Sequence, residues 1–282
     1  MGLRIQNNVE AFNTHRQLVA TSSQAAKSME KLSSGYRINR AADDAAGLAI
    51  SEKMRGQIGG LAQAQRNAQD GISLVQTAEG ALNEVHSMLQ RVRDLKVQFN
   101  NGTLSTDDKD AIASEVYQIA KEVGTIATDT KFNGTAVFSA SGFTFQVGAN
   151  DSETVATTAT NFSGSIATGG GLSELTGLAD AAAAKTALAT GTLSTVGGLD
   201  DAIKNVSKAR ADFGAVQNRL EHRLNNLATY QENLTASESR IRDVDMASEM
   251  TKFTKLNILQ QAGTSMLAQA NQAPQGVLSL LR

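Results

Sequence analysis

This sequence of 282 residues has no cysteine, no tryptophan and a single proline, Pro274. Without cysteine the chain can form neither disulfide bonds nor thiolate metal sites. Aromatic residues make up only 4 % of the chain, so we expect a thin interior spread between paired helices rather than a core built on large rings. Because proline is the strongest helix breaker, its near absence favours long uninterrupted helices.

An excess of charge of one sign is also missing, since 26 basic residues face 28 acidic ones and the net charge is −2. This balance favours neither nucleic acid nor an anionic membrane as the main partner. No segment approaches the roughly 18 consecutive apolar residues that cross a bilayer. The first twenty residues carry Arg4, Glu10 and Arg16 without a continuous apolar run, so we expect no cleavable secretory signal there.

The chain does contain two distant rows of apolar residues at intervals of seven. The first row is Met54, Leu61, Ala68, Val75, Leu82 and Leu89, and the second is Leu199, Val206, Phe213, Leu220, Leu227 and Leu234. A seven-residue interval keeps an apolar stripe on one face of a helix that supercoils against a partner. We predict that the chain turns back on itself and that the rows pair as long antiparallel coiled-coil helices within one subunit. The expected core of this pair is Leu61, Val75, Leu82, Leu89, Phe213, Leu220 and Leu227.

The two ends of the chain carry narrower stripes. In a helix predicted over about 4–32, one phase contains Ile5, Phe12, Val19 and Ala26, and a neighbouring phase contains Ala11, Leu18, Ala25 and Leu32. In a helix predicted over 246–282, the stripe contains Met246, Met250, Phe253, Leu256, Leu259, Met266 and Ala270. Such helices have too little apolar surface to be stable alone in water, so we expect them to need partners.

Between the two strong rows the pattern changes from helical to mixed. Residues 105–108 can cap a helix whose apolar residues run from Ile112 to Ile126 at helical spacing. Alternation over 143–147 predicts a strand, and we expect one small β-hairpin at about 132–148. Residues 149–196 are dominated by Thr, Ala, Ser and Gly, without the context of a phosphate-binding loop. They are therefore predicted to form a short, solvent-exposed and poorly restrained insert.

No residue pattern points to catalysis or to a cofactor. Asp43 and Asp44 could suggest acid–base or metal chemistry, but with no third ligand nearby they fit better as caps of a helix N-terminus. His15, His86 and His222 lie far apart in sequence and in no zinc-binding spacing. We therefore predict no catalytic, cofactor-binding or metal residues and no enzyme activity.

Both ends of the chain carry recognisable motifs. Near the amino end these are LSSGYRINRAADDAAGLAI at 32–50, DGISLVQTAEGAL at 70–82 and QRVRDL at 90–95. Near the carboxyl end they are SRIRD at 239–243, ILQQA at 258–262 and LAQANQ at 267–272. In content and order these segments resemble the bacterial flagellins over about 1–138 and 200–282. The middle of the chain resembles no family, as expected where flagellins vary.

The resemblance implies a mainly α-helical subunit that polymerises into the flagellar filament, the helical propeller of swimming bacteria. It implies that 1–43 with 242–282 form an inner tube, that 44–148 with 197–241 form the surrounding shell, and that 149–196 faces outward. The residues expected to pack subunits together are Ile5, Phe12, Val19, Met250, Phe253, Leu259, Met266 and Leu278. It further implies unfolded export through the flagellar type III apparatus to the cell exterior. The implied partners are further copies of the chain, an export chaperone, the filament cap and the hook–filament junction proteins.

The resemblance also implies a contact with an animal receptor. Some flagellins are recognised by Toll-like receptor 5, and the matching positions here are Arg91, Leu95 and Glu115, with Asp94 in place of the usual glutamate. An ordinary solvated or inter-subunit ion pair is the competing interpretation of these residues.

Three other classes of protein remain as alternatives. A hook–filament junction protein would share the terminal motifs but would normally have a larger middle. A chemoreceptor-type signalling coiled coil would continue its helical pattern through the turn. An enzyme would require a polar cluster in the folded middle.

Overall fold

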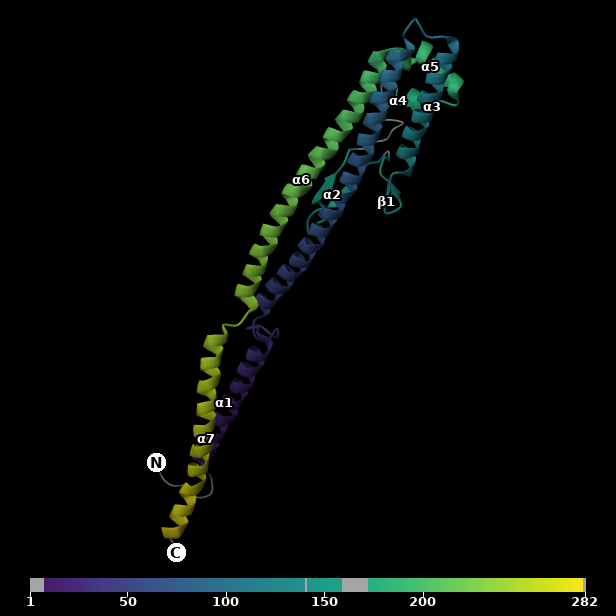
Figure 1. The fold of residues 1–282 in the computed structure, drawn as a ribbon. Helices are drawn as coiled ribbons and strands as arrows, with labels where there is room; N and C mark the ends of the chain where they lie inside the picture. Colours follow the sequence, from purple (N-terminus) through teal and green to yellow (C-terminus); the bar gives the residue numbers. More distant parts are fainter. Residues whose placement is uncertain (1–7, 140, 159–171, 281–282) are drawn as a thin grey trace. The chain divides into compact units, whose positions relative to one another are not determined.

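The computed structural model describes residues 8–139, 141–158 and 172–280, apart from the side chains of Ser173, Thr192 and residues 273–280. The chain divides into two compact units, which Figure 1 shows as a ribbon. The terminal unit comprises Met1–Gly56 and Glu232–Arg282, and the central unit comprises Gln57–Gln231. Two long helices, α2 (Ala45–Phe99) and α6 (Val196–Arg242), contribute residues to both.

In the terminal unit, α1 (Val9–Ser34) packs along α7 (Met246–Leu280) in antiparallel orientation. Asn8 begins α1 by accepting a 3.0 Å hydrogen bond from the backbone N–H of Ala11, and its Nδ2 donates to the carbonyl of Ala270 at 2.7 Å. Gly35 ends α1 in the left-handed region, at φ 76°, which glycine adopts without steric cost. The helix therefore ends near the predicted position, and the pairing of the two chain ends is present.

In the central unit, α2 and α6 form the predicted antiparallel pair. Polar contacts join them at successive levels: Gln65 with Gln231 at 2.9 Å, Glu79 with Arg210 at 3.6 Å, and Arg93 with Asp200 at 2.7 Å. The apolar heptad residues lie between them and are buried: Leu61, Val75, Leu82, Leu89, Phe213, Leu220 and Leu227. Burial of such a row, at ~25 cal/mol per Å² of apolar surface, is the main force that holds the pair together. The mainly α-helical fold class is thus confirmed.

A third helix, α3 (Thr106–Asp129), packs its apolar face into the same core. Ser105 caps it, since its hydroxyl accepts a 3.2 Å bond from the N–H of Asp108, and Asp108 returns a bond by accepting from the N–H of Ser105 at 2.9 Å. This reciprocal arrangement satisfies two backbone donors. The hydroxyl of Ser105 also donates to Oδ2 of Asp108 at 2.7 Å, and this bond, followed by the one from the Ser105 N–H, lowers the pKa of Asp108. The cap predicted at 105–108 is therefore present.

Two short hairpins take the place of the single hairpin predicted at 132–148. The first joins β1 (Lys131–Phe132) to β2 (Thr135–Ala136) through Asn133 and Gly134, both at positive φ. The second joins β3 (Thr144–Gln146) to β4 (Thr154–Ala156), with Phe145 opposite Val155. The predicted strand exists, but its partner lies in the region assigned to the insert. The tight Asn-Gly turn closes the first hairpin at once, and the buried side chain of Val155 draws β4 onto β3.

The described part of the predicted insert is not a loose surface segment. It forms α4 (Leu172–Thr176), α5 (Ala181–Thr190) and a 3₁₀ turn, η1 (Thr192–Ser194), which pack against α3 and each other. Its buried leucines belong to the central core: Leu172, Leu175, Leu188 and Leu193. For the described residues 149–158 and 172–196, the expectation of a poorly restrained, solvent-exposed segment is corrected accordingly, because a few leucines among small residues suffice to anchor short helices. The glycines at 169–171 lie outside the described residues.

A buried lysine fixes α5 to α2. Lys96 is only 2 % exposed, and its Nζ donates to the carbonyl of Leu188 and to Oδ1 of Asn100, both at 2.7 Å. The negative end of the α5 dipole lies at Leu188, where a cation is favoured. Burial lowers the pKa of Lys96, so this ammonium group is held in place at some cost in desolvation.

Candidate assembly surface

Helix α1 has two chemically different faces, and only one of them meets α7. The face that packs on α7 is small and polar, with Thr21, Ala25 and Ser28 buried. Leu18 packs against Gly263. A side chain at position 263 would crowd it, since an added Cβ would lie 3.2 Å from Cδ1 of Leu18. The contact between α1 and α7, which we call the seam, therefore contains Leu18 and Ala25. These residues belong to one of the two seven-residue series that the sequence analysis found in α1.

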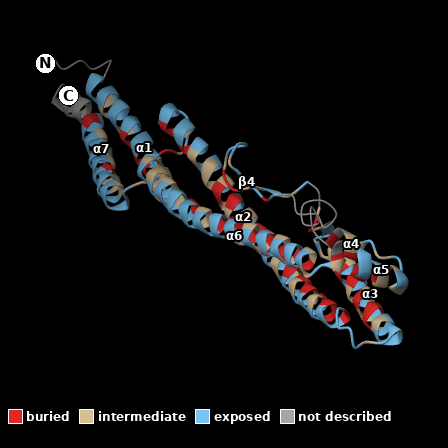
Figure 2. Ribbon diagram, turned by 90° about the horizontal axis from the view of Figure 1, so that it is seen from above, coloured by how far each residue is buried: buried red, intermediate tan, exposed pale blue. Residues whose placement is uncertain are grey.

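The other phase of α1 faces solvent. Phe12 is 70 % exposed and Val19 is 55 % exposed, although both are large apolar side chains. Val9 and Met29 are exposed as well. Together Val9, Phe12, Val19 and Met29 form what we call the outer row of α1. Figure 2 shows that exposed positions dominate α1 and α7, whereas buried positions are frequent along α2 and α3.

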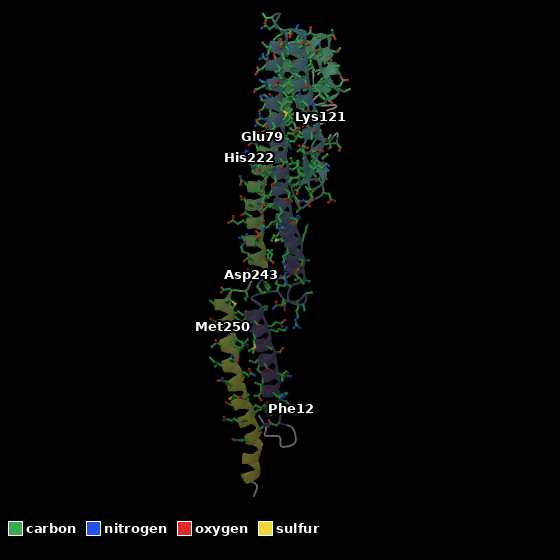
Figure 3. The ribbon with its side chains drawn as sticks, turned by 45° about the vertical axis from the view of Figure 1, so that its right-hand side comes forward. Phe12, Glu79, Lys121, His222, Asp243 and Met250 are labelled. Carbon is green, nitrogen blue, oxygen red and sulfur yellow. The ribbon has the colours of Figure 1, made fainter. Side chains whose placement is uncertain are left out.

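Helix α7 repeats this division. Leu256 and Ala270 are buried, and Phe253 is half-buried. The outer row of α7 consists of exposed Met246, Met250, Ile258, Leu259 and Met266. Figure 3 labels one residue of each outer row, Phe12 and Met250, in the view with side chains.

The outer rows are suited to burial against another protein surface. From 256 to 272 the chain carries no charged residue, and its polar groups are amides and hydroxyls. Uncharged polar groups can exchange hydrogen bonds with water for bonds with a neighbour, whereas buried charges need a counter-charge. Large apolar side chains that stay exposed at several positions along a folded helix indicate an interaction site. The rows of α1 and α7 are therefore the candidate site of this protein.

The structure places the predicted subunit-packing residues as follows. Phe12, Val19, Met250, Leu259 and Met266 are exposed, and Phe253 is half-buried. Ile5 lies outside the described residues, and so does the side chain of Leu278. Ile258, 61 % exposed, was missed by the sequence analysis. Its position next to Leu259 was the available signal, since adjacent side chains point about 100° apart on a helix and an apolar pair therefore extends beyond a single narrow stripe.

The three residues matched to receptor contact do not share one surface. Arg91 and Glu115 are largely exposed and form an ion pair between α2 and α3, with Nη2 2.6 Å from Oε1. Leu95 is 2 % exposed and belongs to the central core. Only Arg91 and Glu115 are therefore available at the surface of the subunit.

The two neighbouring aspartates before α2 have different roles. Oδ1 of Asp44 accepts from the N–H of Gly47 at 2.8 Å. Oδ2 of Asp43 accepts from the backbone of Arg40 at 3.0 Å and of Asn39 at 3.2 Å, and these bonds lower the pKa of Asp43. The capping prediction is therefore confirmed for Asp44, whereas Asp43 closes the turn that precedes α2 instead of capping the helix.

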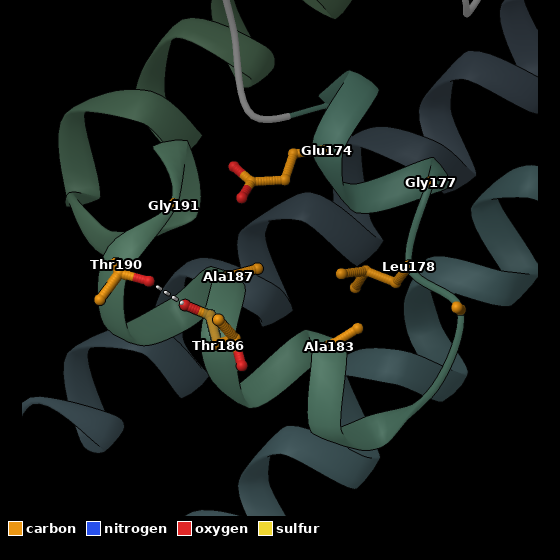
Figure 4. Close-up of a pocket in the computed structure, with 9 residues that line it drawn as sticks. Glu174, Gly177, Leu178, Ala183, Thr186, Ala187, Thr190 and Gly191 are labelled. Atoms are coloured by element: carbon orange, nitrogen blue, oxygen red, sulfur yellow. Dashed lines mark hydrogen bonds between the residues drawn. The ribbon is translucent and has the colours of Figure 1, made fainter.

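A hollow of about 570 Å³ lies beside α4, α5 and the start of η1 (Figure 4). Its walls are mostly Ala, Gly, Leu and Thr, and Glu174 is its single titratable lining residue. Oε2 of Glu174 accepts from the N–H of Leu193 at 3.2 Å, so the carboxylate holds the start of η1. The hydroxyls of Thr186 and Thr190 donate hydrogen bonds to backbone carbonyls of their own helix. The lining does not form a nucleophile–base pair or an oxyanion site.

Across residues 8–139, 141–158 and 172–280, no three His, Asp or Glu side chains gather as a set of metal ligands. Within the same described ranges, no helix combines the length and the apolar character needed to span a bilayer.

Comparison with known proteins shows the family of this chain. Residues 5–142 match the family model of the bacterial flagellin N-terminal helical region, and residues 196–281 match that of the C-terminal helical region. The chain is 50 % identical to a flagellin of Halalkalibacterium halodurans, covering 99 % of both chains. It is 49 % identical to a flagellin of Bacillus subtilis, covering 99 % of this chain and all of that one.

Two more distant proteins extend the comparison. A flagellar filament 33 kDa core protein of Treponema phagedenis is 46 % identical over 99 % of both chains. A solved structure described as a flagellar hook-associated protein of Vibrio parahaemolyticus superposes with a TM-score of 0.59, covering 71 % of this chain and all of that one. At 16 % identity, this last likeness shows a shared fold alone.

The helix pairs, the outer rows and these relatives define the class as structural proteins of the bacterial flagellum. Within that class the chain belongs to the bacterial flagellin family. It is a structural subunit of the flagellar filament, and the relatives give no support to the alternative of a junction protein.

Proposed function

We propose that copies of this chain polymerise through the outer rows of α1 and α7, with 1–43 and 242–282 forming the inner tube of the filament. In this arrangement 44–148 and 197–241 form the surrounding shell, and 149–196 faces outward. The observation that carries the proposal is the exposure of large apolar side chains, from Phe12 to Met266, on two helices that already use another face for each other. Neighbouring copies supply the partner that the outer rows lack within the subunit.

The thin seam between α1 and α7 supports a coupling of folding to assembly. Thr21, Ala25 and Ser28 bury little apolar surface, so the pair gains little stability within one chain. Burial of the outer rows by neighbours adds the missing free energy, and the terminal helices become ordered as the polymer forms. Such termini also suit passage through a narrow channel. We therefore infer type III export to the cell exterior, with an export chaperone, the filament cap and the junction proteins as partners.

Limited proteolysis tests this coupling. In the unassembled chain we expect a protease to remove both ends, to near Ser33 and Ile241, and to leave a helical core, because the isolated terminal helices open easily. The assembled protein should resist the same treatment. Fragment masses and electron microscopy of the pure protein, in which we expect tubes of constant diameter with a central channel, provide the measurement. Protease-resistant ends in a verified monomer would contradict the coupling.

Recognition by Toll-like receptor 5 is a second proposal, supported by the exposed pair of Arg91 and Glu115. An exposed ion pair contributes only about 0–1 kcal/mol to stability, so Arg91→Ala should leave the fold unchanged. If the receptor reads this pair, Arg91→Ala monomer should lose about tenfold or more in a receptor reporter assay. Arg93→Ala on the same helix, which removes the ion pair to Asp200, is the matched control. If Arg91→Ala and Arg93→Ala gave equal receptor responses, the receptor would not recognise the pair of Arg91 and Glu115, which would then be an ordinary surface ion pair.

A further inference from the structure

The junction at which α1 ends and α7 begins is a short ladder of backbone hydrogen bonds. The N–H of Val244 donates to the carbonyl of Gly35 at 3.0 Å, and the N–H of Arg37 donates to the carbonyl of Arg242 at 2.6 Å. Between them Tyr36 and Asp243 form an isolated antiparallel bridge. A ladder this short is weak by itself in water, so side chains must hold it closed.

One side chain joins three of the segments that meet at this junction. Nη1 of Arg242, the last residue of α6, lies 2.6 Å from Oε1 of Glu52 in the early turns of α2. The guanidinium of Arg242 also lies over the ring of Tyr36, directly after α1, at 4.9 Å from the ring centroid. Arg242 is only 12 % exposed at the side chain. The planar guanidinium can donate in its plane to the carboxylate while its face stacks on the ring, which a lysine cannot do.

The electrostatic setting favours a cation at this position. Arg242 stands at the C-terminus of α6, where the helix dipole attracts positive charge. Its hydrogen bond to Glu52 is the main cause that lowers the pKa of that carboxyl, ahead of the charge of Arg55. The buried Nε of Arg242 has no hydrogen-bond partner among the described residues. The position of this side chain is therefore determined by the ion pair and the stacking.

We propose that Arg242 is the positioning residue that closes this junction, by holding Glu52 of α2 and Tyr36 after α1 against the end of α6. The closed junction fixes where α7 starts relative to the end of α1. The proposal rests on the proposed function in one respect. A fixed start of α7 matters for assembly only if the outer rows of α1 and α7 are the surfaces that join subunits. No sequence motif assigns this role, because Arg242 and Glu52 are 190 positions apart.

The neighbouring arginine supplies a matched control. Arg240 lies in the same last turn of α6, and its Nη2 donates a 3.0 Å hydrogen bond to the hydroxyl of Ser237 within its own helix. A change at Arg240 alters the charge of the helix end without touching the junction. Any effect confined to Arg242 is then due to its contacts and not to net charge.

A charge exchange between Arg242 and Glu52 tests the proposal. Amide hydrogen exchange is followed in peptides covering 35–44 and 241–245. It is measured in filaments, where the terminal helices are ordered, and at short labelling times in the unassembled chain, where the junction opens and closes. Arg242→Glu and Glu52→Arg should each speed exchange there by about tenfold or more, since each leaves like charges facing one another. The double variant, which restores an opposite pair, should return the rate to within about threefold of the unchanged protein. Arg240→Glu should change it by less than about twofold.

The stacking is tested separately at Tyr36. Tyr36→Phe keeps the ring face and should preserve slow exchange, whereas Tyr36→Leu removes it and should speed exchange by several-fold. If Tyr36→Phe and Tyr36→Leu showed the same exchange rate, stacking of Arg242 on the ring would not help to close the junction.

Two results would overturn the role of Arg242: unchanged exchange in both single variants, or no recovery in the double variant. A failure of the unchanged protein to polymerise would instead contradict the proposed function. In that event the same peptides of the unassembled chain still decide the role of Arg242, so the two failures are distinguishable.

Discussion

Replacing Phe12 by serine is expected to raise the concentration needed for polymerisation by about 10- to 100-fold while leaving the subunit folded. The ring is 70 % exposed in the subunit, so its loss removes almost no internal contact. Burial of a phenylalanine contributes about 1.5–3 kcal/mol, and each 1.4 kcal/mol is a factor of ten in an equilibrium constant. Combining Phe12→Ser with Ile258→Ser, on the other helix, should enlarge the effect further, because contacts at separate sites add.

A polar residue of α1 provides the comparison. Gln24 is exposed like Phe12, so Gln24→Ser tests a surface change on the same helix without loss of an apolar side chain. We expect its critical concentration to stay within about threefold of the unchanged protein. Sedimentation of polymer at a series of protein concentrations gives the critical concentration, and circular dichroism of the unassembled variants checks the fold. If Phe12→Ser and Gln24→Ser polymerised alike, the outer rows would not be the assembly surface.

The strong heptad rows could be predicted because their pattern depends on a single partner. From Leu61 to Leu89 every seventh residue is apolar, and each of these side chains is buried in the central unit. Burial along such a row is dictated by helix geometry, so the sequence contains all the necessary information. The caps at Asp44 and Ser105 follow local rules in the same way.

The faces of the terminal helices could not be assigned from the sequence, because two apolar phases compete for one partner. Sequence alone does not say whether Phe12 or Leu18 turns toward α7. The structure decides in favour of Leu18, since Gly263 offers a position without a side chain against which leucine can pack. Large residues such as Phe12 are left outside, where they are useful only to a neighbour.

Tertiary contacts account for the other differences. The partner of β3 was misassigned because strand pairing depends on which short segments meet, and Val155 gives only one apolar signal in a polar stretch. Leu95 was grouped with Arg91 by a sequence motif, yet side chains four positions apart on a helix can lie at the edge and the centre of one buried face. The junction at Arg242 depends on residues at opposite ends of the chain, which no local pattern connects.

The second large effect concerns the central unit. Leu82→Ala should lower the free energy of unfolding of this unit by about 2–5 kcal/mol, because the leucine is completely buried between helices and its removal leaves a cavity. Urea or thermal unfolding followed by circular dichroism measures the loss. At temperatures where the variant remains folded, polymerisation should be nearly unchanged, since the outer rows are intact.

A matched pair on the same helix separates burial from composition. Val85 is fully buried and Val97 is 54 % exposed, so Val85→Ala and Val97→Ala remove the same atoms from different environments. We expect a loss of about 1–3 kcal/mol for the first and less than about 0.5 kcal/mol for the second. Similar losses in the two variants would contradict the assignment of Val85 to the buried core of the central unit. Phe12→Ser should weaken assembly without lowering stability, whereas the substitutions at buried positions should lower stability. The comparison therefore separates the roles of the two apolar patterns of the chain. The regular rows hold one subunit together, and the outer rows join it to the next.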